Sequence, residues 1–317
     1  MRLWQQCMIF LARNEYVKRF MQSRATMSTL SKKFVGGQHV RDVVEETKTL
    51  KSKGITSSLF YLGEYIDNKE VISQTITELK SIAKRLAESE LDVHISVDPT
   101  QIGYQLDLRL CQKHAFDLAN EIKSIFDTGN LHSRNFLMLD MEDSTVTDTT
   151  VELYKGLRAK SLPAAITLQT YLYRTKNDLI EIIQSGGAVR LVKGAFAEGK
   201  RIAFTNRGDI DRNFIELAKM MLSEKAHQTG FYPIFGTHDD RIIDEIINIA
   251  DARGWEKDEY EFEMLYGVRS EYQEELVQAG EKLRLYVPFG TDWWPYAVRR
   301  VGESSKNAKF LLKSLVS

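Results

Sequence analysis

The chain has 317 residues, with 43 Lys and Arg against 44 Asp and Glu, a formal net charge of −1, 43% hydrophobic residues and two cysteines. A near-neutral chain lacks the basic stripe of a nucleic-acid-binding protein, and two cysteines are too few for a disulfide framework. No run of 18 apolar residues is present, which excludes a membrane-spanning helix. We therefore expect a soluble, cytoplasmic α/β enzyme or binding protein.

The first 50 residues predict a helical arm, because apolar residues recur there at helical spacing among Lys, Glu and Gln. We treat 1–50 as an N-terminal arm that precedes the main domain, 51–317. The stretch Met1–Ala12 is apolar but contains Arg2 and two glutamines, and no cleavage site follows it, so it is not expected to be a signal peptide. The apolar positions of the arm are Trp4, Met8, Leu11, Tyr16, Val43, Val44 and Leu50.

From residue 55 the pattern changes to short apolar runs, each followed by a longer stretch with helical periodicity. Apolar strands that alternate with helices indicate parallel strands covered on both faces. The runs are Ile55–Leu62, Asp92–Val97, Asn135–Met141, Ala164–Thr170, Ala188–Lys193, Tyr232–His238, Tyr260–Gly267 and Leu283–Gly290. The helical stretches include Val71–Ser89, Val151–Lys160, Asn213–Lys225, Ile242–Asp251 and Glu271–Glu281.

Eight strands in succession predict a closed (β/α)8 barrel, which typically takes about 250 residues. An open doubly wound sheet is the alternative, but it normally carries a glycine-rich turn after its first strand. Here the segment that follows the first run is Gly63-Glu64-Tyr65-Ile66-Asp67, which is not such a turn. The expected fold is therefore α/β, a (β/α)8 barrel with an N-terminal helical extension.

Polar residues that end the apolar runs are the first candidates for function, because active sites of such barrels lie at the carboxyl ends of the strands. Each one alone has an ordinary structural explanation; Asp140, for example, is also well placed to cap the next helix. Six polar strand ends that converge on one mouth are less easily explained that way. They are Asp98, Asp140 with Glu142, Gln169, Arg190 with Lys193, Thr237 with His238, and Tyr286.

Arg190 is the most informative of these, because it lies inside an apolar strand where an unpaired guanidinium is costly. We expect it to point into the barrel mouth toward an acceptor, either Asp140 or a cofactor. A purely structural ion pair is the alternative.

The last predicted helix carries a second group of charges. Tyr296, Arg299, Arg300 and Glu303 are spaced i, i+3, i+4 and i+7, which puts all four on one helical face. Two guanidiniums beside a glutamate suit a carboxylate or phosphate, so the pattern predicts a small anionic substrate. The six histidines show no metal-binding spacing, so no metal site is expected.

Five motifs carry a family resemblance when they are taken together. In these motifs the chain resembles the proline dehydrogenase family, flavoenzymes that oxidise L-proline to Δ1-pyrroline-5-carboxylate, and the resemblance covers roughly residues 50–317. The length is similar to that of the short bacterial enzymes with a single activity. The motifs are Leu139–Glu142, Leu168–Arg174, Val189–Phe196, Thr237–Asp239, and the set Tyr296, Arg299, Arg300 and Glu303.

The resemblance implies a barrel that holds non-covalent FAD across its mouth, in which Arg190 donates to flavin N5 and Gln169 donates to the flavin's polar edge. It makes Asp140 and Arg190 the catalytic candidates, with Asp140 in the charge network beneath the substrate. The other residues that would line the cofactor are Met141, Lys193, Gly194, Ala195, Thr237 and His238.

For the substrate, the resemblance implies that Arg299 and Arg300 clamp the carboxylate and that Glu303 holds the clamp. Tyr286 and Tyr296 would close over the substrate ring. Electrons would pass to a quinone-type acceptor, so peripheral contact with the inner membrane is an option for this cytoplasmic protein. The oligomeric state is not readable from the sequence.

Two positions depart from the family pattern. The second strand normally ends in a lysine, where this chain has Asp98, and Phe196 stands where the family usually has a tyrosine. A carboxylate at this position weakens anion binding. One hypothesis is an ordinary proline dehydrogenase with a rearranged anion pocket; another is a divergent member that oxidises another cyclic or secondary amino acid. A barrel that binds ligand without turnover is the non-enzymatic alternative.

Overall fold

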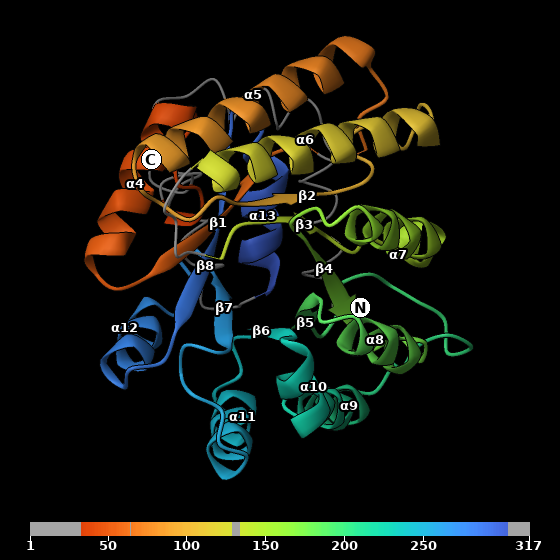
Figure 1. Ribbon diagram of the computed structural model, residues 1–317, viewed down its shortest axis with the longest axis vertical. Helices are drawn as coiled ribbons and strands as arrows, with labels where there is room; N and C mark the ends of the chain where they lie inside the picture. The colour runs from red at the N-terminus through yellow and green to blue at the C-terminus, as the bar shows by residue number, and fades with distance from the viewer. Residues whose placement is uncertain (1–32, 64, 129–133, 304–317) are drawn as a thin grey trace.

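The computed structural model describes residues 33–63, 65–128 and 134–303. Eight parallel strands form a closed barrel in which each strand pairs with its neighbours in chain order and β1 pairs with β8 (Figure 1). This confirms the predicted (β/α)8 fold. The strands are β1 (Thr56–Tyr61), β2 (His94–Val97), β3 (Phe136–Leu139), β4 (Ala164–Gln169), β5 (Ala188–Val192), β6 (Tyr232–Gly236), β7 (Glu261–Leu265) and β8 (Leu283–Phe289).

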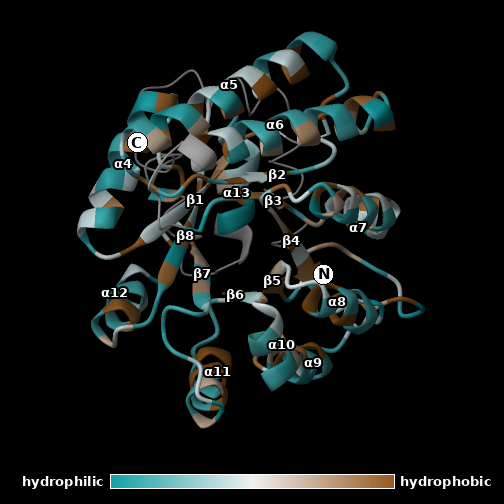
Figure 2. Cartoon of the chain, viewed as in Figure 1, coloured by the Kyte–Doolittle hydropathy of each residue, from teal (hydrophilic) through white to brown (hydrophobic). Residues whose placement is uncertain are grey.

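Helices follow the strands and cover the outside of the barrel, with their hydrophobic faces turned toward it (Figure 2). Each of the eight predicted apolar runs contains one strand, because a strand buried on both faces is apolar at almost every position. The helices are α4 (Val40–Ser52), α5 (Lys69–Glu88), α6 (Leu108–Thr128), α7 (Ser144–Ala159), α8 (Thr175–Gln184), α9 (Arg207–Met221), α10 (Glu224–Thr229), α11 (Asp240–Ala252), α12 (Ser270–Gln278) and α13 (Trp294–Glu303).

Two predicted helical stretches have the wrong bounds. Helix α7 begins at Ser144 rather than at 151, because Asp143 caps it by accepting a hydrogen bond from the Thr145 backbone N–H. Asp140 therefore does not cap this helix. The stretch 213–225 spans two helices, since α9 ends at Met221 and Ser223 caps α10 by accepting from the Ala226 N–H.

The described part of the N-terminal arm packs on the barrel. Val43, Val44 and Leu50 of α4 belong to the same hydrophobic core as the strands. The prediction for Trp4, Met8, Leu11 and Tyr16 lies outside the described residues, and the division at residue 50 stays a prediction. Across the described ranges, no helix combines the length and the apolar character needed to cross a bilayer.

Helix α13 lies over the middle of the strand ring in the view of Figure 1. It packs through Trp294, Tyr296 and Val298 in a second hydrophobic cluster that also contains Phe34 and Phe60. The charged positions on this helix are thereby held close to the barrel mouth.

Candidate active site

Arg190 on β5 is the centre of a buried polar cluster near the carboxyl end of the barrel. Its Nη2 donates to Asp140 Oδ1, its Nη1 donates to Glu263 Oε1 at 2.5 Å, and its Nε donates to Thr167 Oγ1 at 3.1 Å. A longer contact of 3.4 Å joins Nη1 to Ser96 Oγ. These side chains come from β2, β4, β7 and the residue that follows β3, so the guanidinium is fixed from four directions.

The prediction that Arg190 faces an acceptor in the barrel is confirmed for Asp140. A guanidinium has five N–H groups, and the four contacts above use Nε, both hydrogens of Nη1 and one of Nη2. Within the part of the chain that the structure describes, one Nη2 hydrogen is therefore left for a further acceptor. Arg190 can be paired and still donate to a ligand.

Burial disfavours the charged form of each ionisable group in this cluster, so it raises the pKa of an acid and lowers the pKa of a base. It raises the pKa of Asp140 above its ordinary value, although Arg190 and the hydrogen bonds from Tyr286 and Thr167 lower it in part. The pKa of Glu263 is raised by burial for the same reason. Burial disfavours the charged guanidinium, but the Asp140 and Glu263 carboxylates outweigh this effect and raise the pKa of Arg190. Arg190 is thus a permanent cation beside two carboxyl groups.

Tyr286 on β8 completes the cluster. Its hydroxyl donates to Asp140 Oδ2 at 2.9 Å, its ring stacks on Phe60 with centroids 5.6 Å apart, and the Arg190 guanidinium lies 5.2 Å from its centroid. Burial, followed by the negative charges of Asp140 and Asp98, raises its pKa well above the ordinary value. The phenol therefore stays protonated and serves as a donor.

Asp98 is buried at the end of β2, and its negative charge acts on Tyr286. The turn that follows it is held by Glu142, which accepts from the Thr100 backbone N–H at 3.1 Å and from the Thr100 hydroxyl at 2.6 Å. Glu142 thus has a structural role, because it ties the β2 loop to the end of β3.

The rim above β5 and β6 is held by Lys193. Its ammonium lies 2.5 Å from Asp211 and 3.0 Å from Asp239. Asp239 is partly buried, which raises its pKa, but hydrogen bonds from Arg241 and Lys193 outweigh this and lower it to about 2. Thr237 is buried and accepts from the Asp239 N–H. Lys193 therefore stabilises the loop that the sequence predicts beside a cofactor.

Gly194 follows Lys193 in a left-handed conformation, with φ +103°. A Cβ at this position would lie 2.4 Å from the Tyr171 ring, so only glycine fits. The neighbouring Ala195 is exposed, whereas Met141 is buried in the core after β3. Because Gly194 has no side chain, the loop can pass close to Tyr171, which follows β4.

The buried polar atoms that lack a hydrogen-bond partner among the described residues include Gln169 Oε1 and His238 Nδ1. Gln169 uses its amide NH2 on the Met141 and Glu142 carbonyls, which leaves its Oε1. His238 accepts from the Leu265 N–H through Nε2, which leaves Nδ1 as an N–H donor. Burial, with the charges of Arg300 and Arg269, lowers the pKa of His238 to about 4, so the ring is neutral.

Four residues of α13 were predicted to bind the substrate, and the structure describes the side chains of three of them. Tyr296 is buried, and the Arg300 guanidinium lies 5.1 Å from the centroid of its ring. Arg300 is half-buried and close enough to His238 to affect its pKa, whereas Arg299 is exposed. Glu303 ends the helix, and its side chain lies outside the described residues.

A second charged layer lies deeper in the barrel and was not predicted from the sequence. Arg284 is fully buried; it donates to Glu261 through Nε at 2.7 Å, to Asp92 at 2.8 Å and to the Ser57 carbonyl at 2.9 Å. Glu263 was missed as well. The signal that could have found Glu261 and Glu263 is that both lie inside the apolar run 260–267. A charged residue in an apolar run is the criterion that selected Arg190.

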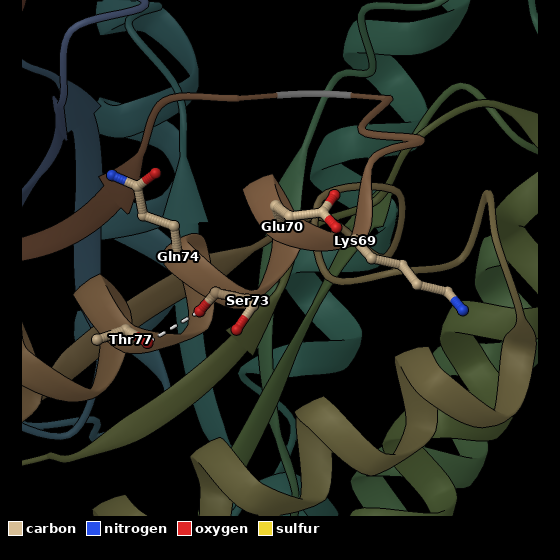
Figure 3. Close-up of a pocket in the computed structure, with 5 residues that line it drawn as sticks. All are labelled: Lys69, Glu70, Ser73, Gln74 and Thr77. Carbon is tan, nitrogen blue, oxygen red and sulfur yellow. Dashed lines mark hydrogen bonds between the residues drawn. The ribbon is translucent and has the colours of Figure 1, made fainter.

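A surface hollow of about 540 Å³ lies along the first turns of α5 (Figure 3). In Figure 3 the side chains come from this one helix, and a hydrogen bond joins the Thr77 hydroxyl to the Ser73 carbonyl. None of them belongs to the polar cluster around Arg190. The lining residues are Lys69, Glu70, Ser73, Gln74 and Thr77.

Residues 43–313 match the profile of the family described as Proline dehydrogenase. The chain belongs to the proline dehydrogenase family. It is 30% identical over 307 residues to Proline dehydrogenase 2 of Bacillus subtilis (strain 168), which covers 97% of each chain. It is 28% identical to Proline dehydrogenase of Deinococcus radiodurans, over 99% of this chain and 98% of that protein. Membership confirms the resemblance and makes the protein an oxidoreductase.

Solved structures share the fold. Proline utilization A (PutA) from Bdellovibrio bacteriovorus, inactivated by N-propargylglycine, matches with a TM-score of 0.77 and 20% identity over 96% of this chain. A PutA mutant from Bradyrhizobium japonicum matches with a TM-score of 0.72 and 18% identity over 90% of it. The chain spans 37% and 32% of the lengths of these two proteins, so the likeness concerns their barrel.

Proposed function

We propose that this protein oxidises L-proline to Δ1-pyrroline-5-carboxylate with a non-covalently bound FAD. Family membership and the names of the curated relatives support the reaction. The observation that carries the proposal is the Arg190 guanidinium, which two carboxylates and a threonine fix near the carboxyl end of the barrel while one N–H stays available.

The residues at the mouth fit a flavin. A flavin ring carries both N–H donors and carbonyl acceptors along its polar edge, and the site offers a buried acceptor, Gln169 Oε1, and a buried donor, His238 Nδ1–H. In this arrangement Gln169 would accept from the flavin rather than donate to it. Gly194 lets the backbone approach closely, and Lys193 holds that loop. Met141, Ala195 and Thr237 would complete the lining.

The chain's own residues would position the reacting groups and stabilise the charge that develops in the reaction. FAD, when bound, would supply the acceptor for the two electrons and the hydride of the substrate. Arg190 would place a fixed cation where negative charge develops, at little cost in reorganisation because its partners already hold it. Asp140 has both oxygens in hydrogen bonds to Arg190 and Tyr286, so its role is to orient these two groups.

The substrate would bind under α13. Arg299 and Arg300 would pair with the carboxylate, and Glu303 would hold them. The partly buried ring of Tyr286 and the buried ring of Tyr296 would cover the pyrrolidine. Asp98 adds negative charge near Tyr286, which suits the cationic amine of an amino acid better than its carboxylate. A quinone-type electron acceptor and peripheral contact with a membrane complete the proposal.

An anaerobic flavin-reduction screen tests the proposal. Protein purified with added FAD should be yellow and should bleach with L-proline faster than with hydroxyproline or pipecolate. A preparation that binds no FAD would refute a flavoenzyme. A yellow protein that proline leaves oxidised and pipecolate or hydroxyproline bleaches would refute proline as the substrate.

The role of Asp98 is tested by D98K, with D107K as the matched control. Asp107 lies exposed on the same loop, so the control makes the same charge change away from the mouth. If Asp98 faces the amine, D98K should raise the proline concentration for half-maximal bleaching about tenfold, the cost of one lost charge pair. An unchanged or lower concentration would show that Asp98 does not face the amine.

A further inference from the structure

Glu263 on β7 is buried at 4% exposure, and it is one of the two carboxylates that pair with Arg190. Its Oε1 accepts from Arg190 Nη1, and its Oε2 has no hydrogen-bond partner in the described ranges. His94 Nε2 likewise has none, while His94 Nδ1 pairs with the Ser58 hydroxyl at 2.9 Å. Ligand atoms of His94, Glu261 and Glu263 all lie within 4.8 Å of one another.

One histidine and two carboxylates at this distance also suit a metal ion, but the surroundings oppose a cation. Glu261 gives both oxygens to Arg284, and its Oε2 also accepts from the Tyr232 hydroxyl. Arg190 and Arg284 both act on His94 as positive charges, so a metal would bind between two guanidiniums. The carboxylates of this cluster are engaged in holding arginines.

We propose that Glu263 is a positioning residue that fixes the Arg190 guanidinium near the barrel mouth, an inference that takes only the identity of the cofactor from the proposed function. Asp140 holds Nη2 and Thr167 holds Nε, so Glu263 is the strong acceptor for Nη1. Without it, Nη1 keeps only the 3.4 Å contact with Ser96. The guanidinium is then free to rotate toward Asp140 and to withdraw the Nη2 N–H that is left for a ligand.

Glu261 provides a matched control. It lies on the same strand, points into the barrel two residues earlier, is equally buried and also pairs with an arginine, but it contacts Arg284 rather than Arg190. E263Q and E261Q therefore make the same chemical change at neighbouring levels. E263A removes the acceptor altogether, whereas E263Q keeps one neutral oxygen for Nη1.

The first experiment uses the full chain without cofactor. Protein labelled with ¹⁵N-arginine should show resolved Nη–H signals for Arg190, assigned by their loss in R190K, because a fixed guanidinium rotates slowly. In E263A and E263Q these signals should broaden and exchange faster with solvent, and in E261Q they should be unchanged. Signals that stay resolved in both Glu263 variants would overturn the inference, and this readout does not depend on FAD or proline.

The second experiment measures flavin reduction at saturating proline, per bound flavin, so that unfolded protein does not count. E263A should fall about tenfold or more, because small misplacements of a catalytic group have effects of this size. E263Q should fall between wild type and E263A, and E261Q should stay within about twofold of wild type. Equal rates in E263Q and E261Q would show a merely structural role. Failure of proline to reduce the wild-type flavin would refute the proposed function and leave the first experiment decisive.

Discussion

Replacing Asp140 by asparagine separates catalysis from stability in this barrel. Asp140 Oδ1 accepts from Arg190 and Thr167, and Oδ2 accepts from Tyr286. An asparagine keeps one oxygen, for Arg190, and turns its NH2 toward the Tyr286 hydroxyl, which must then reorient to accept. D140N thus preserves the shape of the site and removes its charge.

The magnitude follows from these two hydrogen bonds. A hydrogen bond to a charged group is worth about 1 kcal/mol more than one to a neutral group. Loss of the Asp140 charge weakens its hydrogen bonds to Arg190 and Tyr286 by about 2 kcal/mol in total, and this energy is what holds the two groups in position. That is about 30-fold in the rate of flavin reduction. Stability should respond differently. Burial raises the pKa of folded Asp140, so the stability this group contributes is present below its unfolded pKa and lost as the pH rises. The neutral asparagine avoids that loss.

The assay combines anaerobic flavin reduction by proline with urea unfolding of the apoprotein at pH 7. We expect D140N to reduce flavin about 30-fold more slowly and to change the free energy of unfolding by less than about 1 kcal/mol. D148N is the control, since Asp148 is exposed on α7 and pairs only at the surface with Arg174. A wild-type rate, or a loss of about 3 kcal/mol or more in stability, would show that the Asp140–Arg190 pair is structural.

Three further predictions concern other parts of the barrel. E261Q leaves the Arg284 guanidinium buried with one carboxylate fewer, so urea unfolding should show a loss of about 3 kcal/mol with unchanged FAD affinity. His238 has a pKa of about 4 in the folded protein against 6.5 in the unfolded chain, so the stability it contributes is present above pH 6.5 and lost as the pH falls toward 4. In H238N the unfolding free energy of the apoprotein should therefore depend less on pH over that range. K193M leaves Asp239 without its lysine partner, and fluorescence titration should show about fivefold weaker FAD binding, about 1 kcal/mol.

The barrel was predictable because its strands are apolar at most positions and helices separate them. Helix bounds were less so. The first turns of α7 are rich in threonine, so apolar periodicity becomes visible only near Val151, and the start depends on the side chain of Asp143. The break between α9 and α10 depends similarly on the Ser223 cap. Single capping hydrogen bonds set these bounds, and hydrophobic periodicity does not report them.

Most candidate residues were selected because they end strands, whereas the inward-facing charged residues Glu261, Glu263 and Arg284 inside strands were missed. Asp140, Gln169 and Lys193 follow from their position at strand ends, and Arg190 follows from its charge in an apolar run. Glu263 satisfies that second criterion too, but its partnership with Arg190 depends on how β5 and β7 face each other across the barrel. Contacts of this kind are fixed by closure of the barrel, which a strand-by-strand reading of the sequence does not contain.

The two ionic layers differ in whether their arginine has an N–H left for a ligand. Glu261 and Glu263 are two residues apart on β7, so both point inward and each pairs with an arginine at its own level. At the lower level, Arg284 is fully buried among Glu261, Asp92 and a backbone carbonyl, which leaves no access for a ligand. At the upper level, Arg190 keeps one N–H near the carboxyl end of the strands, where barrels bind their substrates. The same pair of residue types therefore forms a closed structural ion pair at the lower level, whereas at the upper level it leaves a cation in place for the proposed reaction.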